Sequence, residues 1–552
     1  MKKIYFLFLL LSLSAFSQEK YTVSGTVYDN SSNETLIGVS VYFPELNAGT
    51  TTNEYGFYSL TIPEGTYKIQ ISYLGFSTII ETINLSEKLT KNFNLKEEAE
   101  SLGEIIIQAD IEKINIRSPQ MSVNKLTSAS IKQIPVVLGE ADVIKSLILL
   151  PGVTSAGEGA SGFNVRGGAA DQNLILLDEA IVFNSSHLFG FFSVFNPDVI
   201  KDVKLYKGGI PARFGGRLSS VLDIYQKEGN SKEFNVTGGI GLVSSRLLVE
   251  GPIEKEKSSF VVAGRASYAH LFLPLFDNDN KAYFYDLNGK FNYRIDEQNN
   301  IFLSTYFGKD VFGVSDNFVN EYGNTVVNLR WNHLFSDKIF SNLSLIYSDY
   351  FYGLILDFVG FEWDSGITNY NLKYDFKHYL NDKFKLSYGI NNIYNRFNPG
   401  EIIPNRADSG IQSEKLIDKY ANEFAAYLEA EHKVNDKLTL QYGMRFSNFT
   451  RLGQDELNVY ENDQPVLYNE ELKKYESAEA IGTESFQRSD VLATFSNFEP
   501  RLSLSYVLDD DTSIKASYNR MAQYLHLLTN TASPTPLDVW APSGRFIKPQ
   551  LL

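Results

Sequence analysis

Apolar and polar residues alternate along the chain from about residue 234 to its end. In one run the apolar positions are Leu438, Leu440, Tyr442, Met444 and Phe446, and similar runs occur near residues 285, 384, 502 and 514. A repeat of two residues is typical of β-strands whose two faces meet different surroundings. The pattern therefore predicts a large β-structure over residues 231–552.

Short and long connections alternate between these runs. Short polar turns occupy residues 254–257, 296–300, 336–338, 381–383, 435–437 and 509–511, and longer connections occupy residues 276–281, 309–323, 351–366, 396–420 and 451–497. Strict alternation puts all short turns at one end of the sheet, which is typical of a transmembrane β-barrel. Aromatic residues near strand ends are expected to form a girdle at the membrane interface, as at Tyr347, Tyr350, Phe351 and Tyr352.

Residues 1–17 have the pattern of a secretory signal peptide. Lys2 and Lys3 precede an apolar run, and small residues stand at Ala15 and Ser17, so we expect cleavage before Gln18. About 13 apolar-leaning residues are too few to span a bilayer, and no later run reaches about 18. The sequence therefore predicts an exported chain without a transmembrane helix.

Residues 18–96 contain short alternating stretches separated by turns at 29–33 and 63–65, which predicts a β-sandwich. The segments 25–27, 36–39 and 52–58 resemble the carboxypeptidase regulatory-like (transthyretin-like) domain. This resemblance does not imply peptidase activity, because a zinc carboxypeptidase needs histidine ligands and residues 20–95 contain no histidine.

Residues 97–112 form a charged linker with a β-prone segment of Glu104, Ile105, Ile106, Ile107, Gln108 and Ala109. Taken alone, this segment is either an ordinary strand or one that pairs with the edge of another sheet. Residues 113–230 mix a helix signal near 141–147 with strand signals at 163–168, 174–178 and 203–209 that end in glycine. The glycine pairs lack the spacing of a nucleotide-binding loop, so an α+β domain is the prediction.

Composition narrows the function classes. The 552 residues include 50 Lys and Arg against 66 Asp and Glu, a net charge of −16, and no cysteine. The acidic balance gives no support to nucleic-acid binding, and the absence of cysteine excludes a thiol nucleophile. Aromatic residues reach 14% while the mean hydropathy is only −0.18. Half-polar barrel strands with aromatic ends have this combination.

With a signal peptide, a small N-terminal β-domain, an α+β domain and a barrel in this order, the whole chain resembles the TonB-dependent outer-membrane receptors of the Bacteroidetes-like type. The matching segments of the family's plug domain are residues 163–168, 173–180, 200–209 and 212–217. Glu179 and residues 218–224 depart from the family pattern, which usually has a glycine at the position of Glu179. The resemblance implies a mostly β protein with an N-terminal transthyretin-like β-sandwich, an α+β plug and an antiparallel transmembrane β-barrel. The six short turns pair about 12 of the family's roughly 22 strands, so we expect residues 231–552 to be a truncated barrel.

The resemblance also assigns site residues. Residues 104–109 stand where the TonB box belongs, between linker and plug. The plug motif comprises Arg166, Gly167, Gly168, Asp178, Lys207, Gly208, Gly209, Phe214, Gly215 and Gly216. We expect Arg166 to be buried beside carboxylates of the barrel wall, and the glycines to serve tight turns.

A second segment of the plug is a candidate for contact with ligand. Its residues are Ser185, Ser186, His187 and Phe189, and a packed aromatic patch is the alternative. His187 by itself is more often a hydrogen-bonded surface residue than a metal ligand. The sequence predicts no catalytic, cofactor-binding or metal-binding residue.

The leading functional hypothesis is energy-coupled uptake of a scarce, bulky solute, such as a ferric siderophore, cobalamin, a glycan or a peptide. Its expected setting is the outer membrane of a Gram-negative cell, with the N-terminal domain in the periplasm. Expected partners are TonB, membrane lipid, the solute and, as an open alternative, a surface lipoprotein, but no nucleic acid. A passive porin or adhesin is the second hypothesis. An enzyme is disfavoured, because no His-Glu-x-x-His or Gly-x-Ser-x-Gly motif occurs.

Overall fold

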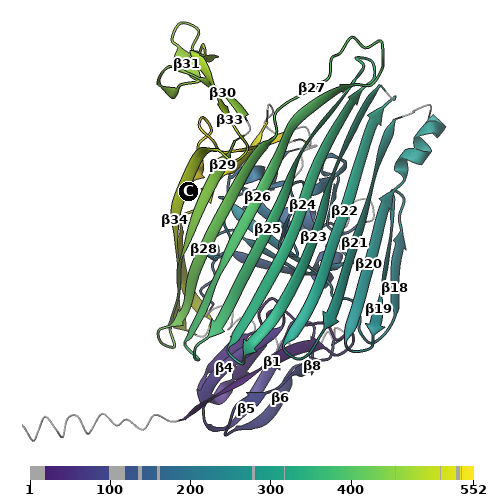
Figure 1. Cartoon of the computed structure of the whole chain (residues 1–552). Coiled ribbons are helices and arrows are strands. Elements are labelled where there is room, and N and C mark those ends of the chain that lie inside the picture. Colours follow the sequence, from purple (N-terminus) through teal and green to yellow (C-terminus); the bar gives the residue numbers. More distant parts are fainter. Residues whose placement is uncertain are drawn as a thin grey trace, which may run out of the picture.

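The computed structural model describes residues 19–98, 118–134, 140–157, 162–276, 280–315, 317–453, 455–509, 511–529, 535 and 538–552. A large curved sheet surrounds a mixed α/β plug, and a small N-terminal β-domain lies beneath one end of the sheet (Figure 1). The predicted signal peptide and residues 104–109 lie outside the described residues.

Two sheets packed face to face make up the N-terminal domain, as predicted. In one sheet β1 pairs with β4, β7 and β8, and in the other the order is β3-β2-β5-β6. Their core is apolar and fully buried, as at Val23, Val41, Phe43, Ile69 and Ile71. The elements are β1 (Lys20–Asp29), β2 (Ser40–Phe43), η1 (Pro44–Leu46), β3 (Ala48–Thr51), β4 (Phe57–Pro63), β5 (Gly65–Ser72), β6 (Ile79–Leu85), β7 (Leu89–Thr90) and β8 (Phe93–Leu95).

The plug is built on a five-stranded sheet in the order β13-β12-β17-β16-β9, with short helices beside it. Asp142 begins α4 because its side chain accepts a hydrogen bond from the Lys145 amide (2.9 Å). The elements are β9 (Val123–Thr127), α3 (Ser128–Gln133), α4 (Val143–Ile148), β10 (Val153–Ser155), β11 (Phe163–Val165), η2 (Ala170–Gln172), β12 (Asn173–Leu177), β13 (Ala180–Ile181), β14 (Ser186–His187), η3 (Leu188–Gly190), β15 (Phe192–Ser193), β16 (Ile200–Tyr206) and β17 (Ser220–Gln226).

Thirteen successive antiparallel strands form the large sheet, and a short fourteenth, β27, pairs with β26. The strands are β18 (Asn235–Ile240), β19 (Ser244–Glu254), β20 (Ser258–Ser267), β21 (Lys281–Arg294), β22 (Asn299–Val314), β23 (Phe318–Ser336), β24 (Ile339–Leu356), β25 (Phe361–Tyr379), β26 (Phe384–Pro404), β27 (Glu414–Lys415), β28 (Lys419–Lys433), β29 (Leu438–Leu452), β34 (Val491–Asp509) and β35 (Thr512–Asn519), with η4 (Ala269–Phe276) between β20 and β21. All six predicted short turns join neighbouring strands, and β18 is the strand beyond the predicted twelve.

The short turns lie at the end of the sheet that carries the N-terminal domain. Asp337 and Asp382, from two of these turns, form ion pairs with Lys88 (3.2 Å) and Lys20 (3.3 Å). Within the described residues, the first and last strands of the sheet, β18 and β35, are not paired with each other. The expectation of further strands beyond this chain therefore stays a prediction.

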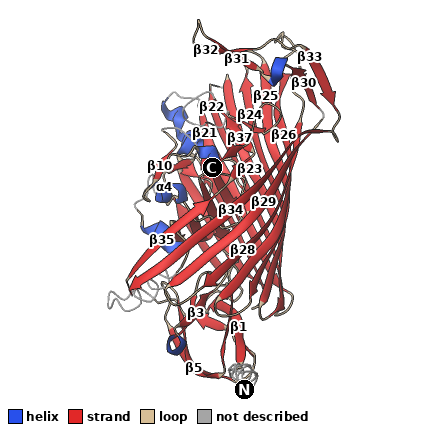
Figure 2. Cartoon of the chain, turned by 90° about the vertical axis from the view of Figure 1, so that its left-hand side faces the viewer, coloured by secondary structure: helices blue, strands red, loops and turns tan. Residues whose placement is uncertain are grey.

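The opposite end differs from the prediction, because several expected loops are strands. β22 continues to Val314 and β23 begins at Phe318, and β23–β26 have 18 to 21 residues each. About 9–11 residues cross a bilayer, so these strands rise well beyond it. Above them stands an arm of β30 (Asp455–Val459), η5 (Glu461–Asp463), β31 (Val466–Asn469), β32 (Lys474–Ser477) and β33 (Gly482–Phe486) (Figures 1 and 2).

The last segment of the chain lies over the plug. Its strands form two pairs, β36 (Ala522–Gln523) with β39 (Gln550–Leu551) and β37 (Leu525–Leu528) with β38 (Val539–Pro542). Tyr524 is fully buried and stacks on Phe449 of the barrel wall, with ring centroids 4.9 Å apart.

The two faces of the large sheet differ as the alternation predicted. Leu345 is 50% exposed, whereas its neighbours Ser344 and Ile346 are 0% and 5% exposed because they face the plug. The predicted aromatic girdle is partly wrong. Tyr350 and Tyr352 are buried in a cluster inside the barrel, because they share the inward parity of Ser344. None of the helices in the described part of the chain is long and apolar enough to cross a membrane.

Candidate functional site

Carboxylates of the plug pair with cations of the barrel wall. Glu140 contacts Arg265 (2.5 Å), and Asp178 contacts Lys290 (3.1 Å). All four of these side chains are buried. Each buried charge therefore has a partner across the boundary between plug and wall, which burial requires.

Asp178 and Glu179 form the turn between β12 and β13, and both have left-handed backbones (φ +45° and +72°). Glu179 accepts hydrogen bonds from Tyr55 of the N-terminal domain (2.5 Å) and from Asn342 (2.9 Å) and Ser344 (2.8 Å) of the wall. Burial opposes its ionisation, but nearby cations, Lys373 first, outweigh burial and lower the pKa of Glu179. The residue that departs from the family's glycine thus joins all three parts of the molecule.

Arg166 corrects a sequence prediction, because it is exposed instead of buried. It follows β11 with φ +51°, and this turn directs its side chain over Gly208 to Ser122, whose hydroxyl accepts a hydrogen bond from Nη2 (2.6 Å). Lys207, beside it, donates to the carbonyl of Pro151 (2.6 Å), and burial lowers the pKa of Lys207. The expected polarity is reversed at Glu140–Arg265 and Asp178–Lys290, where the plug supplies the carboxylate and the wall supplies the cation.

The motif glycines have two different roles. Gly167, Gly209 and Gly216 have positive φ, as predicted for tight turns. Gly168 and Gly215 instead permit close approach: a Cβ at Gly168 would lie 2.5 Å from Ser219 Oγ, and one at Gly215 would overlap the guanidinium of Arg445. Phe214 is buried, with Tyr206 on one side and Arg213 over its ring.

The predicted ligand-facing segment packs against the wall. Ser185, Ser186 and His187 are buried, and His187 Nδ1 and Nε2 lie 2.7 Å and 3.1 Å from Asp310 and Asp286. Burial disfavours the imidazolium, but these carboxylates outweigh it and raise the pKa of His187. His187 is therefore hydrogen-bonded but not at the surface, and Phe189 contacts the rings of Phe312 and Tyr322.

Sequence reasoning missed a second charged cluster at the N-terminal domain. Arg213 Nη1 lies 2.7 Å from Glu54, and its Nη2 lies 3.7 Å from Asp223. Glu54 also pairs with Lys377 of the wall. Burial raises the pKa of Asp223 to about 6, although Arg213 and Lys204 oppose the increase. The only sequence signal was a charged residue inside the motif segment 212–217, and nothing linked it to residue 54.

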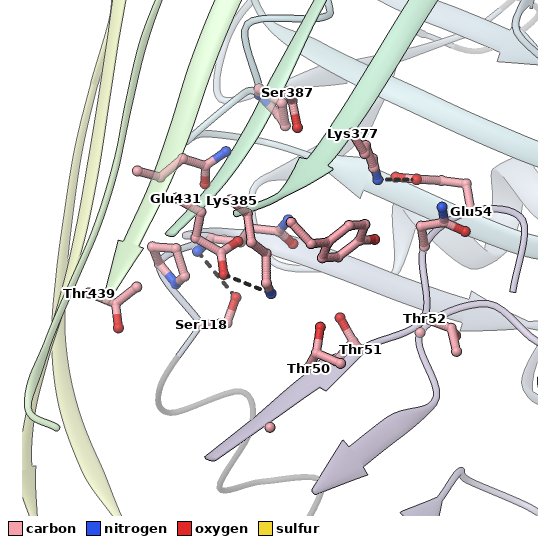
Figure 3. Close-up of a pocket in the computed structure, with 18 of the residues that line it drawn as sticks. Thr50, Thr51, Thr52, Glu54, Ser118, Lys377, Lys385, Ser387, Glu431 and Thr439 are labelled. Atoms are coloured by element: carbon pink, nitrogen blue, oxygen red, sulfur yellow. Dashed lines mark hydrogen bonds and ion pairs between the residues drawn. The ribbon is translucent and has the colours of Figure 1, made fainter. Parts of the chain in front are cut away.

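A cavity of about 930 Å³ lies between the N-terminal domain, the plug and the wall. Figure 3 shows hydroxyl groups around it, including Thr50, Thr51, Ser118 and Thr439. Lys385 and Glu431 of adjacent wall strands form an ion pair at its side (3.3 Å). In the described residues, no group of three or more His, Asp or Glu side chains is arranged to hold a metal ion.

Comparisons with known proteins define the class. Residues 267–545 match the family described as TonB dependent receptor-like, beta-barrel, and residues 115–220 match the TonB-dependent Receptor Plug Domain. Residues 23–107 match the CarboxypepD_reg-like domain, a match that includes residues 104–107 of the predicted TonB box. The chain belongs to the TonB-dependent receptor family, whose barrels lie in the outer membrane.

Individual relatives agree with this assignment. TonB-dependent receptor P3 of Formosa agariphila is 28% identical over 142 residues, which are 25% of this chain and 14% of that protein. The alcaligin outer-membrane receptor FauA of Bordetella pertussis has a TM-score of 0.52 and 15% identity, covering 74% of this chain and 64% of that one. A mutant of the ferric enterobactin receptor PfeA of Pseudomonas aeruginosa has a TM-score of 0.52 and 13% identity, covering 80% and 68%. These two structures show likeness of fold alone.

Proposed function

We propose that this receptor takes up a scarce, bulky solute through the outer membrane by energy-coupled transport. The observation that carries the proposal is a plug bound to the barrel wall by buried charge pairs, including Glu140–Arg265 and Asp178–Lys290. A porin keeps a water-filled channel, whereas breaking one buried pair costs about 3–5 kcal/mol. Movement of this plug therefore needs an outside source of work, which disfavours a passive porin.

The partners follow from this proposal. TonB of the inner-membrane complex binds residues 104–109, lipid surrounds the outward apolar face, and the N-terminal domain lies in the periplasm after cleavage of residues 1–17. The candidate solutes are a ferric siderophore, cobalamin, a glycan or a peptide. FauA and PfeA are receptors for alcaligin and ferric enterobactin, which makes a ferric siderophore the first solute to test. A surface lipoprotein is a second proposed partner, and the arm of β30–β33, which stands above the long strands, is its candidate contact.

The test is solute uptake by cells that express the receptor with Ile105, Ile106 and Ile107 replaced by proline. Proline cannot donate to a β-ladder, so uptake should stop while solute still binds at the cell surface. Replacement of the same three residues by valine keeps strand propensity and should preserve uptake. Unchanged uptake by the proline variant would refute the TonB box, and equal uptake by cells that lack TonB would refute energy coupling.

A further inference from the structure

The turn between β3 and β4 of the N-terminal domain points into the end of the barrel. Asn53 holds this turn, because its side-chain oxygen accepts hydrogen bonds from the amides of Tyr55 (2.9 Å) and Phe57 (3.0 Å). Gly56 has φ +78°, which the turn requires. The side chains of Glu54 and Tyr55 are thereby presented to the plug and to the wall.

Glu54 connects the plug to the wall. One carboxylate oxygen pairs with Arg213 of the plug (2.7 Å) and the other with Lys377 of β25 (Figure 3). Burial opposes ionisation of this carboxyl, but the two cations outweigh it and hold the pKa of Glu54 well below its usual value. A single anion from the N-terminal domain, with a side chain only 9% exposed, therefore restrains Arg213 relative to the wall.

Tyr55 makes a parallel set of contacts. Its hydroxyl donates to Glu179 of the plug, its ring stacks on Phe340 of the wall with centroids 5.0 Å apart, and Arg330 lies over the ring at 4.9 Å. Phe57 extends this apolar contact to Phe340 and Tyr379. Both tip residues thus touch plug and wall at once.

Further contacts hold the N-terminal domain at the rim of the barrel. Thr35 donates to Glu228, which follows the last plug strand (2.7 Å), and Glu228 also pairs with Lys201 (2.8 Å). Lys20–Asp382 and Lys88–Asp337 are more exposed pairs at the turns of the wall. Exposed pairs contribute about 0–1 kcal/mol, so the less exposed contacts of Glu54 and Tyr55 dominate the attachment.

The N-terminal domain also forms one side of the cavity of about 930 Å³, because it contributes Thr50, Thr51 and Glu54 to the lining. The plug and the wall supply the remaining lining, including Ser118, Arg213 and Lys385. A solute that reached this cavity, here called the chamber, would meet the N-terminal domain on one side.

We propose that the N-terminal domain is the periplasmic gate of this receptor. In the position that the structure shows, the turn at residues 53–56 holds the plug to the wall, and the domain obstructs the chamber. Withdrawal of the turn frees Arg213 and opens the exit for the solute. This inference rests on the proposed transport function, and it adds a gating step that the domain itself performs.

The absence of cysteine allows a clean test with engineered disulfides. Glu54→Cys with Lys377→Cys would join the gate to the wall. The matched control is Lys385→Cys with Glu431→Cys, a pair of direct neighbours on wall strands β26 and β28 at the same chamber. Disulfide formation is verified by mass in the purified full chain, and uptake is then measured in oxidised and reduced cells.

We expect oxidation to abolish uptake by the gate variant while solute binding at the cell surface stays unchanged, and we expect reductant to restore this uptake. The control variant should take up solute in both the oxidised and the reduced state. Full uptake by the oxidised gate variant would overturn the gate while leaving energy-coupled transport intact. Loss of TonB dependence in the unaltered receptor would instead overturn the transport proposal.

A second variant tests, without a disulfide, whether Glu54 holds the turn at residues 53–56 in place. Glu54→Ala should increase amide hydrogen exchange at residues 53–57, because the turn loses both ion pairs. Lys88→Ala removes only an exposed rim pair and should leave this exchange unchanged. Equal exchange in the two variants would overturn the conclusion that Glu54 holds this turn in place.

Discussion

Replacement of Glu179 by glycine, the family's usual residue, has two opposite effects on stability: it relieves backbone strain and it removes hydrogen bonds. Glycine relieves a left-handed backbone that costs another residue about 1–2 kcal/mol. It also removes a carboxylate that accepts three hydrogen bonds, each worth about 1.5–3 kcal/mol. Asn342 and Ser344 are buried, so their donors lose a partner that water does not replace. We expect Glu179→Gly to lower the free energy of unfolding by at least about 2.5 kcal/mol.

The assay is thermal unfolding in detergent, combined with hydrogen exchange at residues 53–57. Glu179→Gln retains the side-chain volume and should lose less stability than the glycine variant. Lys473→Gly is the control for strain alone, because Lys473 also has positive φ (+49°) but is exposed on the arm. A Glu179→Gly receptor as stable as the parent would refute the role of Glu179 as a junction, and would show that strain equals the hydrogen bonds in magnitude.

Two further predictions concern charge. Arg213→Ala leaves Asp223 buried with one fewer cation and should lower the free energy of unfolding by about 3–5 kcal/mol. Arg166→Ala removes one exposed hydrogen bond and should lower it by less than about 1 kcal/mol. Equal shifts of the thermal midpoint in the two variants would contradict this ranking. The raised pKa of Asp223, about 6 against roughly 3.9 in an unfolded chain, means that the folded state binds its proton more tightly. The stability contribution of Asp223 therefore increases as the pH falls from about 7 towards 4. Asp223→Asn should reduce that increase in thermal midpoint, and an unaltered pH dependence would count against it.

The period-two alternation determined much of this fold by itself. The pattern located the barrel strands and all six short turns, because alternate side chains of a strand must face opposite sides. It also placed polar residues inside and apolar residues outside at positions such as Ser344 and Leu345. The girdle prediction, not the alternation, failed at Tyr350 and Tyr352: aromatic residues occur on both faces of β24, so residue type alone does not tell which of them face outward.

Charge partners were decided only by the tertiary structure. The motif correctly marked residues 166 and 213 as part of the plug, but it could not tell which of these two arginines forms ion pairs with carboxylates. That depends on a backbone turn at Arg166 and on the arrival of Glu54 and Lys377 from distant parts of the chain. Local sequence determines the strands because their pattern repeats along the chain. The junction at Glu54 and Glu179 has no such repeat, because residues from three distant parts of the chain must meet before either carboxylate has its partners.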